Sequence, residues 1–110
     1  MVKRSPDLNA VFRCLADPTR RDILRRVSHK ELSITNIAAG YERQMSLAAV
    51  SKHLRVLEGA RLVRKRREGR QHLVSLSLPA LKEGARYFEN YKKTWEERLD
   101  RLEAYVAKKK

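Results

Sequence analysis

Residues 46–76 read SLAAVSKHLRVLEGARLVRKRREGRQHLVSL, and this stretch decides the fold. Ser46 is a predicted helix N-cap, because its hydroxyl can accept a hydrogen bond from an unpaired amide of the first helical turn. Apolar residues then recur at spacings of three, four and three, which predicts a helix over 46–58 with one buried stripe. The stripe comprises Leu47, Val50, Leu54 and Leu57.

The opposite side of this helix carries small and cationic residues, namely Ala48, Ala49, Lys52, Arg55 and Val56. A helix that enters the major groove of DNA needs small residues for close approach and long cations for phosphates or guanine. An ordinary solvated helix face has a similar composition. The composition of this segment alone therefore leaves both interpretations open.

The residues that follow, 61–77, predict a hairpin of two strands about a Glu68-Gly69 turn, where glycine can adopt a positive φ. One face of the second strand is predicted to carry His72, Val74, Leu76 and Leu78. Six basic residues and one acid lie between Arg61 and Arg70. Six cations exceed what is needed to protect an exposed strand edge. The hairpin is therefore predicted to bind DNA phosphates, as the wing of a winged-helix domain does.

Three short helices are predicted before this stretch. Ser5-Pro6-Asp7 starts the first, since proline and an acid both suit a first turn, and Asp17-Pro18 starts the second in the same way. Ser33 caps the third, which Gly40 and Tyr41 end. Their predicted buried residues are Leu8, Val11, Phe12 and Leu15, then Ile23, Leu24 and Val27, then Ile34, Ile37 and Ala38. A solvated face, or contacts to DNA backbone, is predicted for Arg20, Arg21, Arg25 and Arg26.

A long final helix is predicted over 79–107. Its apolar residues recur at threes and fours, close to a heptad seam, with one polar interruption at Lys92. The seam comprises Leu78, Leu81, Ala85, Phe88, Trp95, Leu99, Leu102 and Val106. The second half of this helix has nothing left in the chain to bury against. The seam therefore predicts a partner helix, most simply that of a second copy in a two-fold dimer.

Composition limits the class of protein. The chain has 110 residues, which suits one domain, and its net charge of +13 indicates a polyanionic partner, either nucleic acid or an acidic membrane surface. No apolar run is long enough to span a bilayer, and the N-terminus lacks a signal core, so a cytoplasmic protein is expected. Cys14 is the single cysteine, which excludes an intramolecular disulfide and any multi-cysteine metal site.

These elements predict one mostly α-helical domain with a small β-hairpin over residues 1–110. Two helices joined by a short turn, the second with a small-residue face, form a helix-turn-helix, and the basic hairpin makes the unit a winged helix. Within it, 46–58 is the predicted recognition helix, 61–77 the wing and 79–107 the dimerisation helix.

The order of elements and several motifs resemble the ArsR family of small bacterial winged-helix repressors, especially autorepressor-like members that lack metal-binding motifs. The matching stretches are LADPTRRDIL (15–24), LSITNIA (32–38), SLAAVSKHLRVLE (46–58), LVRKRREGRQHLVSL (62–76) and the LEAYV ending of the last helix. The resemblance implies a homodimer built from the first and last helices. It also implies recognition of a palindromic operator by residues 46–55, and repression by blocking transcription.

The chain departs from the family in two respects. The third helix, ITNIAAG, has no Cys-x-Cys motif, the last helix has no histidine, and Cys14 has no second cysteine, so the metal and thiol chemistry of sensor members does not carry over. Relatives usually have glycine where this chain has Arg61, at a point where the backbone turns left-handed. A non-glycine residue there costs on the order of 1 kcal/mol, unless Gly59 lets the turn shift.

The candidate site residues form two sets, with no catalytic or metal-binding residue and no cofactor. DNA contacts are predicted for Ser46, Leu47, Ala48, Ala49, Ser51, Lys52, His53, Arg55, Arg64, Arg66, Arg67 and Arg70. The dimer interface is predicted at Leu8, Phe12, Phe88, Tyr91, Trp95, Leu99, Leu102 and Val106. For His53, a phosphate donor and a packed boundary residue are both open, whereas Cys14 is predicted to be buried filler.

The favoured function is a dimeric, sequence-specific regulator of transcription, acting as a repressor on double-stranded DNA and associated with the bacterial nucleoid when bound. No nucleophile, base and acid occur together, so no enzyme is predicted. Three alternatives remain: a sensor of the same fold with a small molecule near Trp95 and Tyr91, a protein-interaction module using the long helix, and a general nucleoid or RNA binder.

Overall fold

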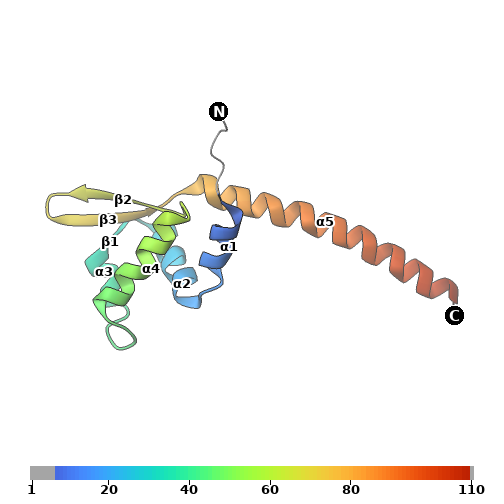
Figure 1. The fold of residues 1–110 in the computed structure, drawn as a ribbon, viewed down its shortest axis with the longest axis horizontal. Coiled ribbons are helices and arrows are strands. Elements are labelled where there is room, and N and C mark those ends of the chain that lie inside the picture. The colour runs from blue at the N-terminus through green and yellow to red at the C-terminus, as the bar shows by residue number, and fades with distance from the viewer. Residues whose placement is uncertain (1–6, 110) are drawn as a thin grey trace.

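The computed structural model describes residues 7–109 as five helices and three strands (Figure 1). In chain order these are α1 (Leu8–Leu15), α2 (Pro18–His29), β1 (Leu32–Ser33), α3 (Ile34–Ala39), α4 (Leu47–Gly59), β2 (Val63–Glu68), β3 (Gln71–Leu76) and α5 (Leu78–Lys109). The β2–β3 hairpin extends from one end of the helical domain, and α5 runs out from the other. The winged helix-turn-helix fold with a long C-terminal helix is thus confirmed.

Side-chain caps begin four of the five helices. The Asp17 carboxylate accepts from the amide of Arg20 at 3.0 Å, the Ser33 hydroxyl from Asn36 at 3.0 Å and the Ser46 hydroxyl from Ala49 at 3.1 Å. These three caps were predicted. Asp7 likewise caps α1, while the Ser5-Pro6 part of that predicted start lies outside the described residues.

The three strands form one antiparallel sheet in the order β1-β3-β2. β1 was not predicted, because two residues are too few to show an alternating pattern. The predicted hairpin turn is wrong by one residue. Glu68 pairs with Gln71, which leaves Gly69 and Arg70 as the loop. Gly69 has φ +62°, as the first position of a type II′ turn requires.

The core lies between α1, α2, α3 and α4 and the base of the hairpin. Most predicted core residues are buried there, including Ile23, Leu24 and Val27 of α2 and Val50, Leu54 and Leu57 of α4. Cys14 is fully buried as predicted, and it shares the inner side of α1 with Val11.

Three predicted inward residues are exposed instead. Leu47 is 62% exposed, because it is the first residue of α4 and lies beyond the part of that helix that packs on the core. His72 lies in the outer half of the hairpin, past the last core contact at Val74. Leu78 already begins α5, so it no longer follows the alternation of the strand.

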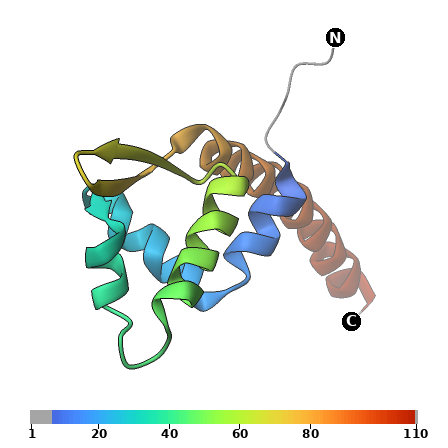
Figure 2. The ribbon, with the colours of Figure 1, turned by 60° about the vertical axis from the view of Figure 1, so that its left-hand side comes forward.

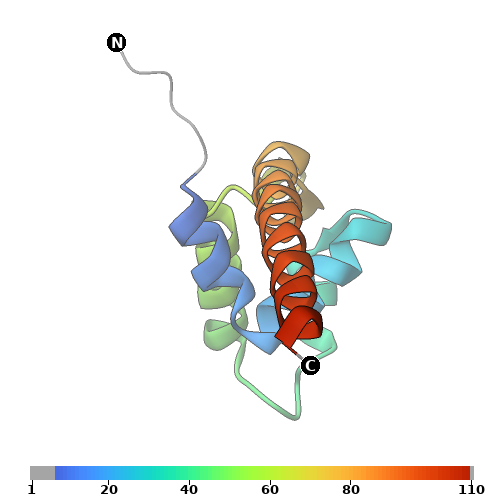
Figure 3. The ribbon, with the colours of Figure 1, turned by 90° about the vertical axis from the view of Figure 1, so that its right-hand side faces the viewer.

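The long helix packs on the domain only near its start. Ala80 and Gly84 are the buried positions of α5 there, whereas Ala85 of the predicted seam is exposed. A Cβ at Gly84 would lie 3.5 Å from the Val11 side chain, so small residues allow α1 to lie close beside α5 (Figure 3). None of the helices within residues 7–109 is long and apolar enough to cross a membrane.

A tight turn connects α4 to the hairpin. The amide of Leu62 donates to the carbonyl of Leu57 and the amide of Arg61 to that of Glu58, both at 3.0 Å, which is the hydrogen-bond pattern of a Schellman cap. Leu57 and Leu62 are both fully buried across it. Arg61 has φ 62°, so the left-handed geometry is kept and Gly59 does not shift the turn.

Replacing Arg61 with glycine should raise the free energy of unfolding by about 1 kcal/mol, because glycine adopts positive φ without a Cβ clash. Urea denaturation at one fixed protein concentration measures the change. Arg61→Ala is the matched control, since it removes the charge and keeps the strain. Equal stabilisation by alanine would show that charge at this position, and not backbone strain, limits stability.

Candidate nucleic-acid interface

The exposed side of α4 carries the predicted contact residues. Ala48, Lys52 and Arg55 are exposed on it, while Val50 and Leu54 are buried on the opposite side. Figure 2 shows α4 lying between α1 and α3. The end of the helix at Ser46 is exposed as well, so its partial positive charge faces solvent. This surface therefore offers a small residue for close approach and two long cations.

The remaining predicted residues of α4 differ in exposure. Leu47 is exposed and remains available for contact, as its place in the predicted contact set requires. Ala49 and Ser51 are half-buried at the margin of the surface. Ser46 already accepts from the Ala49 amide, which leaves its hydroxyl hydrogen free to donate.

The hairpin presents all four of its predicted arginines on its surface, namely Arg64, Arg66, Arg67 and Arg70. Successive residues of a strand point to opposite faces, so Arg64 and Arg66 share one face and Arg67 lies on the other. Arg67 Nε donates to the Gly69 carbonyl at 3.1 Å and so stiffens the turn. Arg66 differs from the others, because it is bonded to Glu31.

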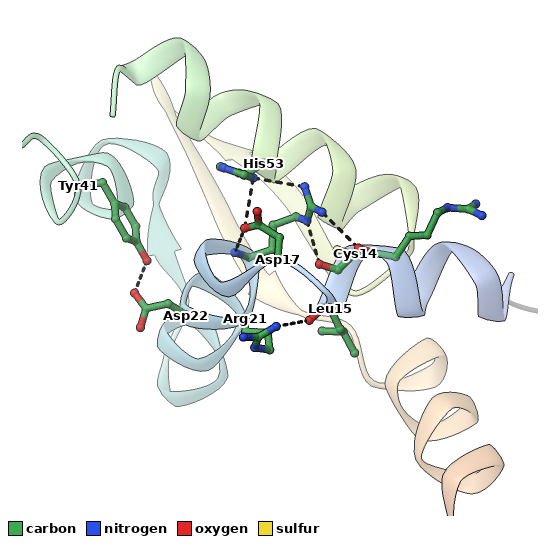
Figure 4. A network of polar contacts seen from close by, with 9 residues as sticks. Cys14, Leu15, Asp17, Arg21, Asp22, Tyr41 and His53 are labelled. Carbon is green, nitrogen blue, oxygen red and sulfur yellow. Dashed lines mark hydrogen bonds and ion pairs between the residues drawn. The ribbon is translucent and has the colours of Figure 1, made fainter. Parts of the chain in front are cut away.

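His53 faces the domain rather than open solvent. Its Nδ1 lies 3.5 Å from Arg20 Nη1 and 4.0 Å from Asp17 Oδ2, and its side chain is 21% exposed (Figure 4). Asp17 itself caps α2, and the amide of Arg20 lowers the pKa of its carboxyl. Of the two open interpretations, these contacts favour a packed boundary residue that ties α4 to the α1–α2 junction.

The solvated face predicted for the α2 arginines is confirmed only in part. Arg21 and Arg25 are exposed, and Arg25 pairs with Asp22 at 2.6 Å, but Arg20, Arg21 and Arg26 also form hydrogen bonds within the domain. Arg20 donates to the carbonyls of Cys14 at 2.8 Å and Arg13 at 3.2 Å, and Arg21 donates to that of Leu15 at 2.7 Å. These carbonyls belong to the last turn of α1, where a cation also suits the helix dipole.

Arg26 makes the same kind of cap for α3, donating to Ile37 at 3.0 Å and Asn36 at 3.2 Å. The Tyr41 hydroxyl donates to the Asp22 carboxylate and lowers its pKa, while burial raises the pKa of Tyr41. Together these bonds hold α3 and the following loop on α2. They join residues 10 to 19 positions apart, so the periodicity of the sequence gave no signal for them.

No group of three histidine, cysteine, aspartate or glutamate side chains that could hold a metal ion occurs within residues 7–109. Burial raises the pKa of the Cys14 thiol, which disfavours the reactive thiolate.

The predicted dimer residues lie mainly along α5. Phe88, Trp95, Leu99, Leu102 and Val106 are each 44–58% exposed. The predicted list also includes Tyr91, which is exposed, and Leu8 and Phe12 of α1, which are half-buried. Ring centroids of Phe12 and Phe88 are 5.0 Å apart, so the two helices share one apolar strip.

A helix-turn-helix domain family model matches residues 15–66, and the curated relatives include three regulators of transcription from two organisms. The HTH-type transcriptional regulator Rv2034 of Mycobacterium tuberculosis is 41% identical over 73 residues, covering 66% of this chain and 64% of the relative. The uncharacterized HTH-type transcriptional regulator YuzN of Bacillus subtilis is 36% identical, covering 67% and 86%. The transcriptional repressor SdpR of Bacillus subtilis is 29% identical, covering 76% and 91%.

Solved structures are similar over most of the chain. The crystal structure of an ArsR family transcriptional regulator has a TM-score of 0.75 at 27% identity, covering 87% of this chain and 97% of that one. A homodimeric winged helix-turn-helix DNA-binding domain from Mycobacterium bovis, described as a possible ArsR-family regulator, has a TM-score of 0.59 at 28% identity, covering 84% and 81%.

The fold, the basic α4 surface and these relatives define a winged helix-turn-helix transcriptional regulator, which is a DNA-binding class and not a class of enzymes. Within that class, the chain belongs to the ArsR family.

Replacing Asp17 with alanine should lower the free energy of unfolding by about 1 kcal/mol at pH 7, through loss of the α2 cap. The pKa of Asp17 is lowered by folding, so its contribution is present above the unfolded value of about 3.9 and is lost as pH falls through the folded value. The difference from wild type should therefore shrink in acid.

Urea denaturation between pH 7 and pH 3 tests this dependence. Ser46→Ala removes a cap of the same geometry that does not titrate, so its cost should stay constant over the same range. A cost for Asp17→Ala that is equally constant would contradict the role of the ionised carboxylate.

Proposed function

We propose that this chain is a homodimeric repressor that binds a palindromic operator in double-stranded DNA through α4 and the β2–β3 hairpin. The observation that carries the proposal is the division of α4 into two sides. Val50, Leu54 and Leu57 fix one side in the core, so Lys52 and Arg55 face outward beside an arginine-rich hairpin. A recognition helix inserted in a major groove needs this arrangement.

Each part of the surface has a distinct role in the proposal. Lys52 and Arg55 read base edges or phosphates in the major groove, and the exposed amide end of α4 at Ser46 faces a phosphate. Arg64, Arg67 and Arg70 of the hairpin reach phosphates or the minor groove. Direct base contact specifies sequence, while phosphate contact fixes position without reading it.

A second copy of the chain completes the site. From Trp95 to Val106 the apolar seam of α5 has no cover within the described residues, and α5, with 32 residues, is about 48 Å long. A helix seam of this length suits the same seam of a second copy, as the homodimeric relative also supports. A two-fold dimer places its two α4 helices about 34 Å apart, one turn of DNA.

Repression follows from where such a dimer would sit. A dimer bound across an operator near a promoter excludes the transcription machinery, and the relative SdpR is a transcriptional repressor. A DNA-bound regulator of this kind would lie on the nucleoid of the cell.

Binding to the DNA upstream of the chain's own gene tests the repressor proposal, with random duplex as the comparison. If the dimer neutralises about eight phosphates, the logarithm of the binding constant should fall with the logarithm of salt concentration at a slope of about −7. Fluorescence anisotropy titrations from 50 to 300 mM salt give the slope. A slope near zero would contradict an electrostatic interface.

Changing Lys52 to alanine should weaken binding to the operator about tenfold and to random duplex less than about twofold, because a base contact is lost only on the specific site. Lys93→Ala, on the exposed surface of α5, removes the same charge away from the proposed interface and should change neither. Equal losses on both DNAs for Lys52→Ala would show that Lys52 only contacts phosphate.

Changing Leu99 to glutamate should convert the dimer to a monomer, because it places a charge in the middle of the apolar seam. Analytical ultracentrifugation should then report 12.9 kDa instead of twice that mass. Asn90→Glu adds the same charge on the opposite side of α5 and should leave the dimer intact. A Leu99→Glu protein that remains dimeric would contradict a dimer formed through this seam.

A further inference from the structure

The outer half of the β2–β3 hairpin has no core of its own. Every side chain from Arg66 to His72 is exposed, and the last buried residues of the two strands are Val63 and Val74. A two-stranded ribbon is only marginally stable in water by itself. The direction in which the hairpin points must therefore depend on contacts with the rest of the domain.

Two ion pairs tie the hairpin to the domain, one from each face. Lys65 Nζ lies 3.4 Å from Glu58 Oε1 on α4. On the next residue of the strand, Arg66 reaches Glu31, in the segment between α2 and β1. Neighbouring residues of a strand point to opposite faces, so the hairpin is held from both sides.

The Arg66–Glu31 pair has the stronger geometry of the two. Arg66 Nε donates to Glu31 Oε2 at 2.9 Å and Nη2 donates to Oε1 at 2.7 Å, which is a two-pronged pairing. The remaining nitrogen, Nη1, lies 3.0 Å from Glu68 Oε2 at the hairpin turn. Exposed ion pairs commonly contribute little, but bidentate pairs within a network are the exception. The hydrogen bonds from Arg66 also lower the pKa of Glu31.

We infer that Glu31 is a positioning residue for DNA binding, which fixes the direction of the hairpin through Arg66. In this arrangement all three nitrogens of Arg66 are engaged with carboxylates, so Arg66 orients the wing and does not bind phosphate. Arg64, Arg67 and Arg70 are then the hairpin arginines that bind the DNA. The inference rests on the proposed function, because it concerns how the wing is presented to the duplex.

If Glu31 masked Arg66 instead of positioning the hairpin, its removal would change the affinity for DNA in the opposite direction. If Glu31 merely masked an arginine that binds phosphate, removing its charge would free Arg66 and strengthen DNA binding. Removing any acid from a protein that binds a polyanion also strengthens binding by charge alone. A positioning role instead predicts weaker binding by Glu31→Gln, against the general electrostatic trend.

Operator binding by Glu31→Gln and Arg66→Lys tests the inference. Arg66→Lys keeps the charge but loses the two-pronged geometry, so both variants should weaken operator binding about fivefold, and the double variant no more than either alone. Glu97→Gln is the matched control, because it removes an exposed acid from α5, opposite the seam, and should change binding less than about twofold. Operator binding by Glu31→Gln that equals or exceeds wild type would overturn the inference.

A measurement without DNA separates this inference from the proposed function. The ¹⁵N heteronuclear NOE of the hairpin-tip amides of Gly69, Arg70 and Gln71 should fall in Glu31→Gln and stay unchanged in Glu97→Gln. Unchanged values in Glu31→Gln would overturn the inference even if the chain binds DNA. If the wild-type chain selects no DNA, the proposed function fails, while these values still decide whether Glu31 fixes the hairpin.

Discussion

Burial of one side of α4 is the constraint on which the rest of the structure depends. Val50, Leu54 and Leu57 are at most 1% exposed, and burying each such side chain stabilises the fold by about 1.5–3 kcal/mol. Because residues of a helix have fixed angular spacing, this burial sets the rotation of α4 and turns Lys52 and Arg55 outward. The same burial extends through Leu57 and Leu62 into the turn that begins the hairpin, so the recognition helix and the wing share one support.

The large positive charge of the chain serves two physical purposes. Arginines of α2 donate to carbonyls in the last turns of α1 and α3, where they hold neighbouring helices in place. Lys52, Arg55, Arg64 and Arg70 instead lie exposed on the surface. Net charge alone therefore overstates the number of cations available to a polyanion, because the fold already uses some of them in its own hydrogen bonds.

Much of the fold could be predicted from local patterns. The caps at Asp17, Ser33 and Ser46 join residues three positions apart, and the stripe of α4 follows from helix periodicity, so both are encoded within a few residues. The left-handed turn at Arg61 was instead expected from the resemblance to relatives that have glycine at this position.

The side-chain contacts that were missed in the sequence depend mainly on distant partners. Arg20 meets His53 across 33 residues and Arg66 meets Glu31 across 35, and no local pattern reveals such pairs. For the same reason the buried face of early α5 was misplaced. Because α1 lies close to the start of α5, the small residues Ala80 and Gly84 are buried there, although a heptad pattern favours larger residues at buried positions. The outward position of Lys52 and Arg55 was thus predictable, whereas the contacts that orient the hairpin were not.

Selection of bound sequences from a pool of random duplexes tests the central claim most directly. The measurement needs no knowledge of the regulated gene and reads sequence preference and symmetry together. The account predicts enrichment of an inverted repeat whose half-sites lie about 10 base pairs apart, centre to centre, as two α4 helices in a two-fold dimer require. Enrichment of no common sequence, with all duplexes bound equally, would contradict a sequence-specific regulator and indicate general binding to nucleic acid through charge.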